Sequence, residues 1–260
     1  MSKNFPSVEI SFSKDGYLHL LKRVMENKYS ILPMREAHRC SDPAMILRHD
    51  VDFSIDLALE MARIEHRLGV RSTFFFMTTC DYYNVFSAHG RSALIEINSL
   101  GHEVGLHWDS NFLPENRDDQ ADFFKAQLRM LSSVTGQEVL SASQHIPTDT
   151  PIFDISPFVK INAYSKSVND RYGYVSDSSM SWRQYTPLDF LAKKVSFQFL
   201  AHPIWWMADG STQAEKINFF ITTLCNKNIE LANSYLLYMN KVLDSRDLYD
   251  ERFRTVQGSV

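Results

Sequence analysis

Two aspartates stand one residue apart after a short apolar run: Asp50 and Asp52 follow residues 44–47. In an extended chain alternate side chains point to the same face, so both carboxylates can reach one cation or one water molecule. A bound cation would relieve their mutual repulsion. The structural alternative is a solvated turn, in which the aspartates precede the helix-capping residue Ser54. The pair therefore indicates either a metal site or a turn.

Acidic, amide and imidazole side chains also follow later apolar segments of the chain. These residues are His107, Gln144, His145, Asp177 and His202. In a parallel α/β fold the carboxyl ends of the strands lie at one edge, where catalytic groups collect. We therefore expect these side chains to meet the two aspartates.

Two other histidines are expected to point away from that edge. His102 is five residues before His107 on one predicted strand, so the two side chains face opposite sides. His49 lies directly before Asp50, and it therefore belongs to the opposite face of its own strand. We expect a structural role for His102.

A site of carboxylate and imidazole ligands with an open position suits Zn²⁺ or a similar divalent metal. Such an ion lowers the pKa of bound water from 15.7 to roughly 7. A carboxylate outside the coordination shell can then take the proton of the water, and a histidine across the site can protonate a leaving group. This combination predicts hydrolytic chemistry.

Strands and helices alternate along the chain with short connections, which favours a parallel sheet wrapped by helices. The predicted strands are 44–47, 72–77, 102–107, 138–145, 159–165, 172–179 and 195–202. The predicted helices begin near Asp15 and Ser54 and then cover 91–100, 117–135 and about 212–243, the last of them as one or two pieces. Glycines 69, 101 and 136 are expected to close three of these helices. At 260 residues, a closed or partly closed β/α barrel is expected rather than two smaller domains.

Composition excludes several classes of function. The net charge is −4 and the isoelectric point is about 6.1, with no cluster of basic residues, so no nucleic-acid or membrane-surface partner is expected. No apolar stretch is long enough to span a membrane. Cys40, Cys80 and Cys225 show no metal-type spacing and are typical of a reducing compartment. We expect one domain, residues 1–260, in the cytoplasm, and the sequence does not predict an oligomeric state.

From about Ile46 to Trp206 the chain resembles the polysaccharide deacetylase family, the NodB-homology carbohydrate esterases. The resemblance consists of five ordered blocks: RHDVD, GHEVGLHWDSN, QHIPTDTP, SDSSMSW and FLAHPIWW. It implies a distorted (β/α) barrel of about seven strands. It also implies that Asp50 is the catalytic base, that Asp52 and His107 bind metal, that Asp177 organises the site and that His202 is the catalytic acid.

The chain departs from the family pattern at two places. The second metal histidine of the family is replaced by Asn111, and we expect His145 to be the third ligand, with Asn111 and Asp109 as alternatives. The arginine that orients the base is absent from the block QHIPT, and Arg48 or Arg183 is expected in that role.

Tryptophans near the last two blocks are candidates for stacking on a sugar ring. We expect Trp182 and Trp206 to contact substrate, the alternative being that these residues and Trp205 wall the core or the barrel mouth.

The expected function is that of a metal-dependent N-deacetylase acting on an acetamido sugar or a precursor of a surface polysaccharide. The expected metal is Zn²⁺, with Co²⁺ or Ni²⁺ as alternatives. Two other functions remain open: hydrolysis of another C–N bond, as in a cyclic amide or ureide, and glycan binding without catalysis, for which Asn111 is the main indication.

Overall fold

The computed structural model describes residues 10–38, 43–147 and 153–257. Contacts divide the chain into two units, Met1–Lys216 and Ile217–Val260, which we describe separately. The expectation of a single domain over residues 1–260 stays a prediction. Within the described residues, no helix has the length and apolar character needed to cross a membrane.

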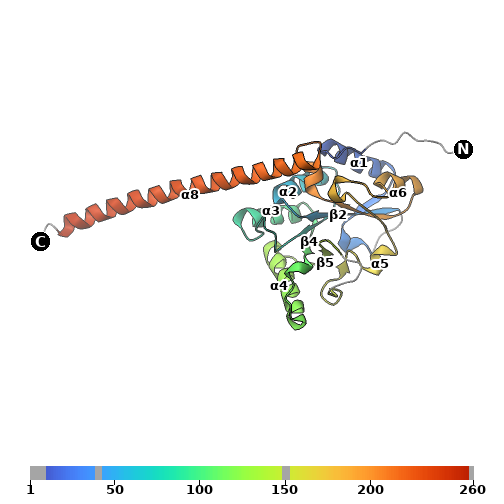
Figure 1. Cartoon of the computed structure of the whole chain (residues 1–260), viewed down its shortest axis with the longest axis horizontal. Helices are drawn as coiled ribbons and strands as arrows, with labels where there is room; N and C mark the ends of the chain where they lie inside the picture. Colours follow the sequence, from blue (N-terminus) through green and yellow to red (C-terminus); the bar gives the residue numbers. More distant parts are fainter. Residues whose placement is uncertain (1–9, 39–42, 148–152, 258–260) are drawn as a thin grey trace. The chain divides into compact units, whose positions relative to one another are not determined.

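The first unit is built on a parallel sheet, of which Figure 1 labels β2, β4 and β5. Its strand order is β6-β5-β4-β3-β2-β8-β7. The strands are β1 (Ser30–Leu32), β2 (Ala44–Val51), β3 (Thr73–Phe76), β4 (Glu103–Trp108), β5 (Ser141–Gln144), β6 (Ile161–Asn162), β7 (Gly173–Ser176) and β8 (Phe197–Ala201). One edge of β2 is shared, because β1 pairs with residues 44–46 and β3 pairs with residues 48–51. The strand β2 therefore pairs with three strands, β1 and β3 along one edge and β8 along the other.

The sheet curls so that its two end strands approach each other. No pairing joins β6 to β7 among the described residues. However, the ring of Tyr164, just after β6, lies 6.3 Å from the ring of Tyr174 in β7. The side chain of Gln198 in β8 also donates to the carbonyl of Ala163 at 3.4 Å. The fold is thus an α/β half-barrel with seven strands along its path, which confirms the distorted barrel expected from the sequence.

Helices surround this sheet and their ends follow local sequence signals. They are α1 (Lys14–Glu26), α2 (Ile55–Arg67), α3 (Ala88–Ser99), α4 (Arg117–Thr135), α5 (Lys166–Asn169), α6 (Pro187–Lys193) and α7 (Pro203–Met207). The hydroxyl of Ser54 accepts the amide N–H of Leu57 and caps α2, as predicted. Gly69 and Gly136 end α2 and α4 at φ values of 72° and 70°, a conformation that glycine adopts without strain.

Several predicted boundaries were wrong. Ser13, not Asp15, caps α1, because its hydroxyl accepts the amide N–H of Gly16, while Asp15 lies in the first turn, where the helix dipole favours negative charge. The strand predicted to end at Leu47 continues to Val51, because residues 48–51 pair with β3. The helix expected at 91–100 begins at Ala88. The last helix, α8 (Gln213–Gln257), is one piece and extends beyond the predicted end at residue 243.

A buried polar cluster lies between α2 and the face of β2 that carries His49. Glu65 of α2 has 0% exposure and accepts hydrogen bonds from the hydroxyls of Tyr17 and Ser72. Nε2 of His49 lies 2.7 Å from one oxygen of Glu65, and Nδ1 of His102 lies 3.5 Å from the other. Burial by itself raises the pKa of the Glu65 carboxyl. The combined effect of His49, His102 and the hydrogen bond from Ser72 is larger and opposite, so the pKa falls below the ordinary value. The cluster therefore stabilises Glu65 as a carboxylate.

We predict that Glu65→Gln destabilises the fold by about 3–5 kcal/mol at pH 7, because removing one partner of a buried ion pair leaves the other uncompensated. The pKa of Glu65 is lower in the folded than in the unfolded state, so its contribution is complete above the unfolded pKa of about 4.5 and is lost as the pH falls through the folded pKa. Urea unfolding should show the gap between wild type and variant shrinking below about pH 4.5. A gap that stays constant from pH 7 to pH 3.5 would contradict this assignment.

Candidate metal centre

Three of the predicted site residues meet at the carboxyl edge of the sheet. Asp52 follows β2, His107 is in β4 and His145 follows β5, and one potential ligand atom from each lies within 4.8 Å of the other two. They line a pocket of about 400 Å³ together with Asp50 and His202. These are the residues that sequence reasoning named as metal ligands, base and acid, although their roles remain predictions.

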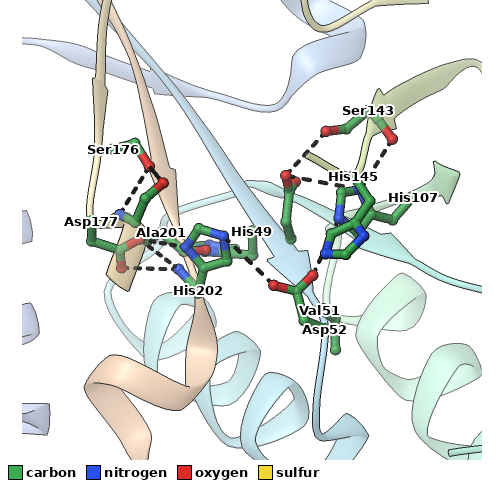
Figure 2. Close-up of polar contacts among 12 residues, drawn as sticks. His49, Val51, Asp52, His107, Ser143, His145, Ser176, Asp177, Ala201 and His202 are labelled. Atoms are coloured by element: carbon green, nitrogen blue, oxygen red, sulfur yellow. Dashed lines mark hydrogen bonds and ion pairs between the residues drawn. The ribbon is translucent and has the colours of Figure 1, made fainter. Parts of the chain in front are cut away.

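The contact between His107 and Asp52 is favourable only if a proton or a cation lies between the two side chains. Nδ1 of His107 lies 3.0 Å from the carbonyl oxygen of Ser143 and must carry a proton to donate there. In the neutral ring Nε2 is then unprotonated, and it lies 3.2 Å from Oδ1 of Asp52, a buried oxygen with no hydrogen-bond partner (Figure 2). Two acceptors in contact repel each other unless a proton or a metal ion lies between them.

The pKa values of the two side chains agree with this reading. Burial lowers the pKa of His107, but Asp50 and the contact with Asp52 raise it more, so the net direction is upward. Burial raises the pKa of Asp52, but the contact with His107 and its charge, with His202 and His145, lower it more. The surroundings therefore stabilise a negative Asp52 and a positive charge beside it, whether a proton or a metal ion.

The imidazole of His145 is oriented in the same way as that of His107, by an oxygen atom beside its Nδ1. Nδ1 of His145 lies 3.0 Å from Oδ2 of Asp109, which leaves Nε2 free to act as a ligand. The backbone N–H of His145 donates to the carbonyl of Trp108 at 2.8 Å and holds the residue beside β4. Metal-binding histidines usually donate their other N–H to a carbonyl or carboxylate, as His107 and His145 do. One carboxylate and two such imidazoles fit a catalytic divalent metal that keeps an open position.

Asp50 lies beside the ligands without belonging to their group. Its Oδ2 accepts a hydrogen bond from the hydroxyl of Ser143 at 3.1 Å and lies 3.7 Å from the guanidinium of Arg48. Arg48 also donates to Ser143 at 3.0 Å and to the hydroxyl of Tyr164 at 2.6 Å. The other oxygen, Oδ1, is buried and has no partner. Asp50 is therefore positioned through one oxygen and free to accept a proton through the other.

Sequence reasoning named Arg48 as a residue that could orient the base. In the structure the guanidinium of Arg48 lies beside Asp50, the residue expected to be that base. Arg48 precedes Asp50 by two residues in β2, so their side chains share one face. Arg183, the alternative, lines the pocket. Sequence reasoning missed Ser143, whose hydroxyl connects Arg48 to Asp50; its only sequence signal is a small polar residue inside the predicted strand 138–145.

On the opposite side of Asp52 lies a second group, built around Asp177. Nδ1 of His202 lies 2.6 Å from Asp177, and Nε2 lies 3.8 Å from Asp52 (Figure 2). The indole N–H of Trp206 donates to the other oxygen of Asp177 at 2.6 Å. Burial lowers the pKa of His202, but the Asp177 carboxylate, with Asp52 and Asp50, raises it to about 9. A cation at Asp52 would oppose part of this rise. Asp177 thus stabilises His202 in its protonated form.

The prediction that Trp182 and Trp206 contact substrate does not fit the structure. Trp206 is fully buried, and its polar atom is engaged by Asp177. Trp182 packs against Phe12 and Trp206, with ring centroids 5.2 and 6.2 Å away, and it does not line the pocket. Trp205, the neighbour of Trp206 in α7, lines the pocket instead. Adjacent residues on a helix point in different directions, so the sequence alone did not identify which tryptophan faces the pocket.

The remaining candidates are also placed. His49 and His102 contact Glu65 behind the sheet, so both point away from the pocket as expected. Asn111 is exposed, and its backbone N–H donates to Asp109 at 2.8 Å. Asp109 in turn holds the ring of His145. The geometry therefore favours His145 over Asn111 or Asp109 as the third ligand.

Comparison with known proteins gives matches among solved structures only. No protein-family model and no curated protein matches the sequence. A CE4-family pseudoenzyme from Bacillus anthracis is 16% identical with a TM-score of 0.40, over 70% of this chain and 60% of that one. The deacetylase PplD of Streptococcus pyogenes, in complex with acetate, is 13% identical with a TM-score of 0.48, over 75% and 92%. IcaB from Ammonifex degensii is 19% identical with a TM-score of 0.42, over 56% and 72%.

The chain thus spans about three fifths of the length of the pseudoenzyme structures that it matches. The descriptions of these pseudoenzymes name the CE4 family, and another matched structure from Bacillus anthracis is described as a family 4 carbohydrate esterase.

We predict that Asp52→Ala and His145→Ala abolish stoichiometric binding of Zn²⁺, because each removes one of three ligands. Metal content after dialysis against Zn²⁺, Co²⁺ or Ni²⁺ and isothermal titration measure this directly. The control is His89→Ala, since His89 is an exposed imidazole outside the pocket. Full occupancy in His145→Ala would exclude His145 as the third ligand.

Asp109→Ala tests the orientation of His145 separately. Without the carboxylate that fixes its ring, the affinity for metal should fall roughly 10- to 100-fold while one ion still binds. Titration with a competing chelator measures the constant. An unchanged affinity would mean that the contact with Asp109 does not prepare His145 for a ligand.

Proposed function

We propose that this protein is a metal-dependent hydrolase that removes acetyl groups from the nitrogen of acetamido sugars. The observation that carries the proposal is the arrangement around Asp52. A carboxylate with a free buried oxygen, on Asp50, and the imidazole of His202, whose pKa is raised by Asp177, line one pocket with a three-residue ligand group. Hydrolysis of an amide needs this combination of a base, an acid and a site for an electrophile.

Two residues carry out the proton transfers, Asp50 as the base and His202 as the acid. Oδ1 of Asp50 accepts the proton of the attacking water while Arg48 and Ser143 hold Oδ2. His202, kept protonated by Asp177, gives its proton to the amide nitrogen as the C–N bond breaks. The products are acetate and a free amine. A divalent metal held by Asp52, His107 and His145 would polarise the carbonyl and lower the pKa of the water.

The donor set supports Zn²⁺ as the metal, with Co²⁺ and Ni²⁺ as alternatives, because imidazole suits all three ions. The pocket has the size of a small-molecule site, and Tyr164, Tyr174 and Trp205 supply the aromatic part of its lining. Flat rings of this kind can cover the apolar face of a sugar. The choice of an acetamido sugar over another amide rests on the resemblance of the motif blocks to the deacetylases. The cytoplasmic location remains a prediction.

We predict that Asp50→Asn and His202→Ala each lower the rate of acetate release roughly 10²- to 10⁴-fold, as expected for loss of a general base or acid. Both variants should retain the metal, since neither residue belongs to the ligand group. The assay measures acetate released from N-acetylglucosamine and its oligomers, with metal content measured on the same samples.

The same assay separates the alternatives. Hydrolysis of cyclic amides or ureides without acetate release would replace the proposed substrate and keep the mechanism. Full metal occupancy with no hydrolysis of either class would favour a protein that binds glycans without catalysis. Loss of metal in Asp50→Asn would mean that Asp50 is a ligand.

A further inference from the structure

The helix α8 carries many exposed large apolar side chains. It is one continuous helix of 45 residues, drawn in orange and red in Figure 1. Most residues of its stretch 217–243 are exposed, including Leu231, Tyr235 and Tyr238 at 61%, 63% and 61%. Large apolar side chains exposed together in this way usually mark a contact surface.

The spacing of these residues identifies the kind of partner. One stripe of the helix, which we call the seam, follows alternating steps of four and three residues from 217 to 242. It consists of Ile217, Ile221, Leu224, Asn228, Leu231, Tyr235, Tyr238 and Val242. A repeat of seven residues drifts around a straight helix and remains on one side only when the helix supercoils around another helix. The surface therefore fits a helical partner.

The single polar member of the seam indicates which helix this is. Burial of Asn228 against an apolar partner would be unfavourable, because its amide would lose its hydrogen bonds to water. A second copy of α8, parallel and in register, presents the same amide at the same level, and the two can hydrogen-bond. Buried asparagines at this position of a heptad set register in parallel coiled coils.

Charge is compatible with such an assembly. The only charged residues from 217 to 243 are Lys227, Glu230 and Lys241, so parallel copies meet little repulsion. This stretch also lacks the strongly basic polar face of helices that lie on membranes.

We propose that α8 is a self-association helix, which pairs in parallel with α8 of another copy of this chain through the seam. A second stripe, Ile229, Leu236 and Leu243, recurs at intervals of seven residues and lies about 100° around the helix from Asn228, Tyr235 and Val242, on a different side of α8. The assembly can therefore contain two or more strands. The proposal does not depend on the proposed catalytic function.

The test measures the mass of the full chain by light scattering and analytical ultracentrifugation over a range of concentrations. We expect a dimer or a larger closed oligomer. Leu231→Lys places a charge in the seam and should weaken association more than about tenfold. Asn233→Lys places the same charge outside both stripes and should leave the mass unchanged. Circular dichroism and metal content confirm that both variants remain folded.

A third variant tests the role of Asn228. Asn228→Leu should tighten the association, since it replaces the polar pair with apolar packing, and should relax the register. A monomeric wild type at all concentrations would overturn the proposal, as would equal effects of Leu231→Lys and Asn233→Lys. Weaker association of Asn228→Leu would show that Asn228 does not lie in a seam between copies.

Discussion

The central constraint in this structure is the balance of charge along the buried strand β2. All eight residues from Ala44 to Val51 are buried, and three of them, Arg48, His49 and Asp50, are ionisable. An isolated buried charge is strongly unfavourable, so each needs a partner on its own side of the sheet. Much of the surrounding architecture supplies these partners.

The buried charges on the two faces of β2 have different partners. Towards the pocket, the guanidinium of Arg48 lies beside Asp50 and donates hydrogen bonds to Ser143 and Tyr164. These bonds link β2 to β5 and to the chain after β6. Towards the helices, His49 meets Glu65 of α2. The pocket side leaves one oxygen each of Asp50 and Asp52 without a hydrogen-bond partner, whereas both oxygens of Glu65 accept hydrogen bonds from hydroxyl groups of the protein. This asymmetry separates a site prepared for a ligand from a cluster that stabilises the fold.

The buried cluster also contacts the strand β8 directly before His202. Nδ1 of His49 lies 3.3 Å from the carbonyl oxygen of Ala201, the residue directly before His202. His49 itself directly precedes Asp50. The same imidazole thus joins the backbones of β2 and β8 one residue before the proposed base and the proposed acid. A fixed separation of those strands is one condition for a base and an acid to act across one pocket.

The sequence by itself determined the parallel α/β architecture, because apolar segments and capped helices alternate with short connections. It also determined which strand ends carry the polar residues, and the period of two placed His49 and His102 away from the site. Tertiary structure decided what depends on contacts between distant segments. Pairing with β3 extended β2 past Leu47, and the approach of β5 brought Ser143 to Asp50 and His145 to Asp52. The turn of α7 directed Trp205 rather than Trp206 to the pocket. Local pattern encodes the face on which a side chain lies, but its partner depends on which strands the sheet brings together.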